Sequence, residues 1–191
     1  MFKSRLKEIS FLIDKLSSMP NLEEKIELAI TMILNCVKLE KPLLVCGNGG
    51  SASDSEHITG ELVGRFLKQR RAINAISLVS NSAAITAWAN DYNYDSIFAR
   101  QVEAHAKNGG LLLCISTSGN SKNILQAIQT AKDLKLPVIG MTGEGGGKMK
   151  ELCDLLLEVP SNYTPRIQEM HIMLYHYICE EIEKRYEDGL S

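Results

Sequence analysis

The chain has 191 residues, of which 45% are apolar, and this is enough for one domain to bury a full core. A formal charge of -2, with Lys and Arg spread along the sequence, argues against proteins that bind nucleic acid or anionic membranes through a basic surface. The five cysteines show no C-x-x-C spacing and mostly lie in apolar runs, so we expect reduced core residues. The N-terminal segment is charged every few residues, which predicts neither a signal peptide nor a membrane span and therefore a cytoplasmic protein.

Two helices are expected first. Apolar residues recur at helical spacing within residues 3–17 and again within 21–39. Asn21, followed by two acidic residues, is typical of a helix start. The first helix is amphipathic and has no obvious partner within the chain, so we predict that it contacts another subunit.

The next stretch predicts a buried strand, a glycine turn and a helix. The apolar run 43–46 is followed by Gly-Asn-Gly-Gly at 47–50, where the backbone needs conformations that glycine adopts easily. Ser51, Ser53 and Asp54 have side chains suited to an N-cap, so we expect the helix to begin near Ser51. The unpaired N–H groups and the positive dipole end of such a helix favour an anion.

The same helix carries His57 and Glu61, which are four residues apart and therefore on one face. An imidazole and a carboxylate at this spacing could share a metal ion or a substrate proton. A solvated helix face with a weak His to Glu contact is the alternative. The neighbouring anion site favours the functional interpretation.

The remaining elements alternate between strands and helices, which predicts one α/β domain. Its five-stranded parallel sheet would be doubly wound, flavodoxin-like and covered by helices on both faces. Within this domain, residues 1–39 would form an N-terminal helical part, 40–160 the α/β core and 161–191 the C-terminal helix. The later strands are expected at 73–78, 111–115, 137–141 and 155–159, and the later helices at 82–88, 96–106, 122–134 and about 165–186.

A second polar turn repeats the first arrangement. Residues 116–121, Ser-Thr-Ser-Gly-Asn-Ser, follow a predicted strand and precede a predicted helix, and their hydroxyl and N–H groups suit a phosphate monoester. An ordinary N-cap with surplus serines is the alternative, and the twin turn at 46–53 argues against it. Neither turn has the spacing of a nucleoside triphosphate or dinucleotide site, so a small phosphorylated metabolite fits better. For the polar loop 90–95 taken alone, a simple turn is favoured over a ligand site.

The closing helix has an unusual density of polar residues for a helix that must also pack against the core. They are Arg166, Gln168, Glu169, His171 and His176. For His171, a core or packing role is at least as plausible as a role near a site. His105 stands near the end of a predicted helix, where a positive charge stabilises the helix dipole, so it needs no functional role.

CGNGGS, H-x-x-x-E, STSGNS and RIQEMH with His176 beyond it together resemble the sugar isomerase (SIS) family over nearly the whole chain. More narrowly, they are similar to the branch that converts sedoheptulose 7-phosphate to D-glycero-D-manno-heptose 7-phosphate, the first step towards activated heptoses for lipopolysaccharide core, capsule or another glycoconjugate. The resemblance implies a homotetramer and one Zn²⁺ per subunit. The zinc ligands that it implies are His57, Glu61, Gln168 and His176. The proton-transferring pair that it implies is Glu61 and His176. The substrate contacts that it implies are Asn48, Gly49, Gly50, Ser51, Glu61, Asn90, Asp91, Ser116, Thr117, Ser118, Ser121 and Gln168.

The chemistry of these residues is compatible with that activity. Interconversion of a ketose and an aldose needs a base that removes a proton beside a carbonyl and an acid that returns one, and a carboxylate and an imidazole can divide this work. The main alternative is a non-catalytic SIS protein that binds the replication initiator DnaA. It resembles the chain in both turns and in RIQEMH, but has no use for a proton-transferring pair.

Helix geometry adds one expectation. Gln168 and His176 are eight residues apart, about 12 Å along a helix, so one straight helix would not bring both to one ion. We therefore predict that the site forms between subunits.

Overall fold

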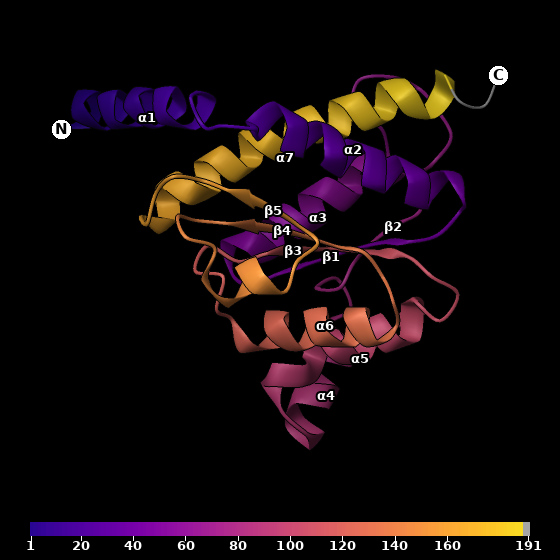
Figure 1. Cartoon of the computed structure of the whole chain (residues 1–191). Coiled ribbons are helices and arrows are strands. Elements are labelled where there is room, and N and C mark those ends of the chain that lie inside the picture. The colour runs from indigo at the N-terminus through magenta and orange to yellow at the C-terminus, as the bar shows by residue number, and fades with distance from the viewer. Residues whose placement is uncertain (189–191) are drawn as a thin grey trace.

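A computed structural model gives the structure of residues 1–188, which is built on one five-stranded parallel sheet (Figure 1). The strand order is β2-β1-β3-β4-β5, and every neighbouring pair is parallel. The predicted fold class is confirmed. The strands are β1 (Leu43–Gly47), β2 (Ala75–Ser77), β3 (Leu111–Ile115), β4 (Val138–Thr142) and β5 (Leu155–Glu158).

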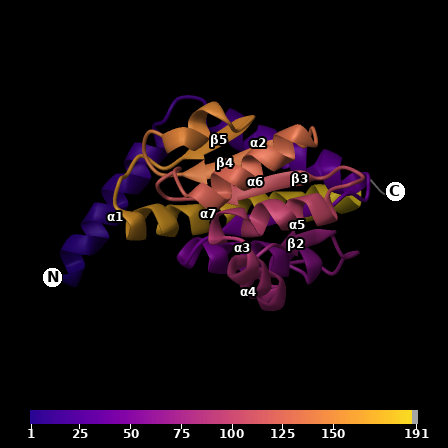
Figure 2. The ribbon, with the colours of Figure 1, turned by 90° about the horizontal axis from the view of Figure 1, so that it is seen from below.

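Helices cover both faces of the sheet. On one face lie α2 (Leu22–Lys38), α3 (Gly50–Val63) and α7 (Thr164–Asp188), and on the other α5 (Ile97–His105) and α6 (Lys122–Asp133). α4 (Ser82–Asp91) projects below α5, and α1 (Phe2–Ser17) extends outward past the beginning of α7 (Figures 1 and 2). Two short 3-10 helices, Tyr94–Ser96 and Gly147–Glu151, complete the described chain, in which no helix combines the length and apolar character needed to cross a bilayer.

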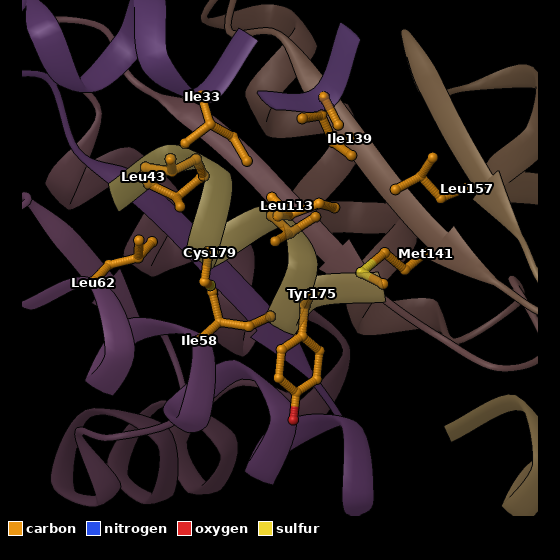
Figure 3. Close-up of a pocket in the computed structure, with 13 residues that line it drawn as sticks. Ile33, Leu43, Ile58, Leu62, Leu113, Ile139, Met141, Leu157, Tyr175 and Cys179 are labelled. Atoms are coloured by element: carbon orange, nitrogen blue, oxygen red, sulfur yellow. The ribbon is translucent and has the colours of Figure 1, made fainter. Parts of the chain in front are cut away.

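The core consists of two apolar clusters, one on each face of the sheet. Leu43 and Val45 of β1 face the cluster beneath α2, α3 and α7, whereas Leu44 and Cys46 face the cluster beneath α5 and α6. Such central strands are apolar on both faces, which explains why they read as continuous apolar runs in the sequence. Figure 3 shows the first cluster, which encloses a cavity of only about 10 Å³. This space is packed core and not a ligand site.

Three local expectations were wrong. α3 begins at Gly50 and is capped by Gly49 without a side-chain hydrogen bond, so Ser51, Ser53 and Asp54 are not its N-cap. The residues Asn90 and Asp91 end α4 and do not belong to a loop. α1 does have a partner within the chain, because its residues Leu12 and Leu16 are buried and pack into the first core cluster.

Candidate active site

A pocket of about 270 Å³ opens at the carboxyl ends of β1 and β3, between which the strand order reverses. Gly47 at the end of β1 pairs with Ile115 at the end of β3, so the two polar turns lie side by side. The lining comes from these turns and the start of α7, and eight of its ten residues are predicted substrate contacts. It consists of Asn48, Gly49, Gly50, Ser51, Ile115, Ser116, Thr117, Ser121, Thr164 and Gln168.

The glycines of the first turn allow close approach of the backbone. Gly49 has a φ of 57°, a conformation in which residues with a Cβ are strained. A Cβ on Gly47 would stand 2.3 Å from the backbone oxygen of Ser51, and one on Gly50 would stand 2.3 Å from Nε2 of Gln168. Glycine therefore lets α3 begin directly behind β1, with α7 against its first turn. The N–H groups of Ser51, Ala52 and Ser53 donate to the carbonyl oxygens of Asn48 and Gly49, so the N–H groups of Gly49 and Gly50 and the positive end of the helix dipole are what suit an anion here.

The second turn presents hydroxyl groups to the same pocket. Ser116 is buried, and its Oγ lies 3.2 Å from Oγ of Ser121 at the start of α6. Ser118 differs from these two: it is exposed, its Oγ accepts a hydrogen bond from the N–H of Asn120, and it is not part of the pocket lining.

A pair of amides joins the first turn to the start of α6. Nδ2 of Asn48 donates to Oδ1 of Asn123 at 2.8 Å, and Nδ2 of Asn123 donates to Oδ1 of Asn48 at 2.8 Å. The same Oδ1 of Asn48 accepts from the hydroxyl of Tyr94. Asn123 is 97% buried and was missed at the sequence level, because only the sheet register brings residues 75 positions apart into contact. The signal that could have found it was an amide two residues after the serine turn.

Three predicted metal ligands meet further along α3 and α7. His57, Glu61 and His176 each offer one ligand atom, and these atoms lie within 4.8 Å of one another. Nε2 of His57 is 3.0 Å from Oε1 of Glu61 and 3.4 Å from Nε2 of His176. The His57 side chain is 44% exposed and that of Glu61 is 21% exposed, so the cluster is open to small molecules.

This donor set fits a first-row metal ion. Two donors bound to one tetrahedral ion at about 2.0–2.1 Å lie roughly 3.3 Å apart, close to both separations from Nε2 of His57. Two imidazoles and one carboxylate, with a remaining open position, form the kind of ligand set that catalytic metal sites use. The cluster is therefore a possible metal centre.

The other predicted site residues lie elsewhere in the chain. Gln168 lines the pocket at the strand ends beside Gly50, and its eight-residue separation from His176 along α7 corresponds to about 12 Å. Asn90 and Asp91 are exposed on the last turn of α4, where Nδ2 of Asn90 donates to Oδ1 of Asp91, and they are not part of the pocket lining. Their assigned roles remain predictions.

His171 has the core role that was weighed for it. It is fully buried, and its Nε2 lies 3.2 Å from the carbonyl oxygen of Thr142 at the end of β4. Burial lowers the pKa of His171 to about 4, although the Thr142 carbonyl acts in the opposite direction. The imidazole is therefore neutral near pH 7 and holds α7 to the sheet.

Comparison with known proteins places these features in a family. The family model of the SIS domain matches residues 9–143. A phosphoheptose isomerase of Aliarcobacter butzleri is 51% identical over 162 residues, covering 85% of this chain and 86% of the relative. One from Helicobacter pylori (strain P12) is 47% identical over 169 residues and covers 88% of both chains.

Comparison with solved structures leads to the same kind of protein as comparison of the sequences. The phosphoheptose isomerase of Neisseria gonorrhoeae superposes with a TM-score of 0.89 at 35% identity, covering 96% of this chain and 97% of the other. That of Francisella tularensis gives 0.90 at 34% identity and covers 96% of both chains. The chain therefore belongs to the SIS domain family and, within it, to the phosphoheptose isomerases.

Proposed function

We propose that this protein is an aldose-ketose isomerase that converts sedoheptulose 7-phosphate to D-glycero-D-manno-heptose 7-phosphate. The observation that carries the proposal is the meeting of Glu61 and His176, from two different helices, at an open cluster. Both helices lead from this cluster back to the pocket of backbone N–H and hydroxyl groups at the strand ends. Membership of the phosphoheptose isomerase family supports the choice of substrate.

The reaction moves two protons across one carbon-carbon bond. A proton leaves C1 of the ketose while the carbonyl oxygen at C2 takes one up, and this gives an enediol. C2 then receives a proton and the hydroxyl on C1 gives one up, which leaves the aldehyde. Glu61 and His176 are the groups that we assign to the two proton transfers at carbon, since a carboxylate and an imidazole serve as base and acid near neutral pH.

The phosphate end of the substrate would lie in the pocket between the turns. Hydroxyl groups of Ser116 and Ser121 and the N–H groups of Gly49 and Gly50 at the start of α3 suit phosphate oxygens. The pocket lining contains no Lys or Arg, so recognition would rest on hydrogen bonds and the helix dipole.

His57, Glu61 and His176 would hold a zinc ion, to which the family resemblance adds Gln168. When bound, zinc supplies Lewis-acid polarisation of the substrate carbonyl and oxygen atoms. The distance of Gln168 from this cluster along α7 supports a site completed by a neighbouring subunit, as does the position of Asn90 and Asp91 outside the pocket. A homotetramer in the cytoplasm agrees with this arrangement, and the five free cysteines suit a reducing compartment.

The proposal is tested by incubating the protein with sedoheptulose 7-phosphate and added Zn²⁺ and following the aldose by NMR. We expect turnover by the parent and loss of about 10²-fold or more in Glu61→Gln and in His176→Gln, because each removes one proton-transferring group. Glu56→Gln, a neighbouring exposed carboxylate on α3, is the matched control and should retain activity.

An inactive parent would contradict the enzyme assignment. If that parent bound the heptose phosphate without turnover, the result would favour the non-catalytic regulator instead.

A further inference from the structure

Tyr175 joins the core to the candidate metal cluster. It precedes His176 on α7, is 98% buried, and packs among apolar residues that include Ile58 and Cys179. Figure 3 shows its ring extending away from these residues, with the hydroxyl at the far end. That hydroxyl lies 2.9 Å from Nδ1 of His57 and 3.5 Å from Oδ1 of Asp54. A buried tyrosine needs such partners for its hydroxyl, and both partners here lie on α3.

Asp54 has no other evident task. It is 93% buried, it does not cap α3, and its Oδ2 has no hydrogen-bond partner among the described residues. A buried polar group normally has a hydrogen-bond partner. The group next to it is the hydroxyl of Tyr175, which donates to Asp54.

The direction of the hydrogen bonds follows from what each group can do. Nε2 of His57 faces Glu61 and His176, so it must be free of its proton to bind a metal ion there. The ring proton of neutral His57 then sits on Nδ1 and can be donated to the oxygen of Tyr175. Tyr175 in turn donates its own proton to the carboxylate of Asp54, which only accepts. In this arrangement Nδ1 of His57, the hydroxyl of Tyr175 and Oδ1 of Asp54 each have a hydrogen-bond partner.

We propose that Tyr175 and Asp54 are positioning residues that hold His57 with its proton on Nδ1 and its Nε2 directed at the metal cluster. This inference rests on the zinc site of the proposed function and deepens it. Groups behind a metal-binding histidine fix its tautomer and ring orientation, and their loss typically lowers metal affinity about 10- to 100-fold.

Zinc binding to the metal-free protein tests the proposal without any use of turnover. In competition with a chelating dye, Tyr175→Phe should bind Zn²⁺ about 10- to 100-fold more weakly than the parent, because it keeps the ring and loses only the hydroxyl. Tyr177→Phe is the matched control: the same change on the exposed side of α7 should leave the affinity unchanged. Asp54→Asn retains an acceptor for Tyr175 and should lose less affinity than Asp54→Ala.

A second measurement separates positioning from loss of structure. In ¹⁵N NMR of the zinc-loaded parent, Nδ1 of His57 should carry a proton that is protected from exchange, and this protection should be lost in Tyr175→Phe. Urea unfolding of the metal-free forms should show that Tyr175→Phe is still folded.

Parent affinity in Tyr175→Phe, or a parent that binds no zinc, would overturn the inference. A parent that binds zinc but does not isomerise the heptose phosphate would contradict only the proposed function.

Discussion

At the scale of single residues, the surroundings of each histidine decide its chemistry. His57 and His176 lie partly in the open at the cluster, whereas His171, five residues before His176 on the same helix, is fully buried against β4. Helical periodicity alone distinguishes a buried position from an exposed one, but it does not say which polar atoms will meet. The contrast between these histidines therefore gives separate predictions for stability and for catalysis.

The pH dependence of stability should contain a contribution from His171. With its pKa lowered to about 4 in the folded chain, this imidazole stays neutral there, whereas it takes up a proton below about pH 6.5 when the chain unfolds. The unfolded state binds more protons between these values, so stability falls as the pH drops from about 6.5 to about 4. In His171→Gln, roughly 3 kcal/mol of this decrease should disappear.

Urea unfolding of metal-free protein at several pH values between 7 and 4 measures this effect. His105→Gln, at the exposed end of α5, is the matched control and should keep the slope of the parent. Parallel stability curves for the parent and His171→Gln would contradict the buried neutral histidine.

At the scale of elements, one carboxylate holds α7 to the segment that follows α3. Glu183 accepts hydrogen bonds from three consecutive backbone N–H groups, those of Phe66, Leu67 and Lys68, at 2.6–2.8 Å. It also pairs with Arg70, whose Nε lies 3.3 Å away and whose side chain is fully buried. Burial alone would raise the pKa of Glu183, but the three N–H donors and Arg70 together lower it.

Neutralising this carboxylate should destabilise the fold strongly. Glu183→Gln leaves the buried Arg70 charge without its partner, and we expect a loss of roughly 3–5 kcal/mol in the free energy of unfolding at pH 7. Because the pKa of Glu183 is lowered on folding, its contribution is present above the usual carboxylate pKa and is lost on acidification. The difference between parent and variant should therefore shrink below about pH 4.

Chemical denaturation of the two proteins across this pH range is the measurement. Glu180→Gln removes an exposed ion pair with Lys184 on the same helix and should change stability by about 1 kcal/mol or less. Equal small effects of Glu183→Gln and Glu180→Gln would contradict the holding role of Glu183.

The sequence predicts a feature well when the residues that determine it are close together in the chain. β3 was predicted with its observed bounds, because a continuous apolar run stands between Gly110 and Ser116. The start of α3 was predicted to within one residue, but its cap was misassigned, because Ser51 and Asp54 look like capping residues and are instead buried by tertiary contacts. Glu61 and His57 could be paired from their spacing. In contrast, the links from Tyr175 to His57 and from Asn123 to Asn48 cross between elements and leave no local pattern.

At the scale of the whole molecule, α1 leaves apolar surface uncovered. Phe2, Leu6, Phe11 and Ile13 are exposed on this helix, which extends away from the sheet in Figures 1 and 2. Exposed apolar residues gathered on one projecting helix are typical of an interface with another chain. This surface agrees with the proposed homotetramer and with a site that neighbouring subunits complete.

Charging α1 should disrupt that assembly. In the double variant Leu6→Glu, Phe11→Glu, we expect sedimentation velocity to show species smaller than a tetramer, with helix content close to that of the parent by circular dichroism. Leu134→Glu places the same charge on an exposed apolar residue just after α6 and should leave the assembly intact. A parent that is monomeric and fully active would contradict both the assembly and the shared site.

The reciprocal amide pair between Asn48 and Asn123 has a consequence for the energetics of ligand capture. Because each side chain both donates to the other and accepts from it, the first polar turn is tied to the start of α6 before any phosphate arrives. The site then loses less conformational entropy when a ligand binds. Less of the binding free energy is spent on ordering the protein.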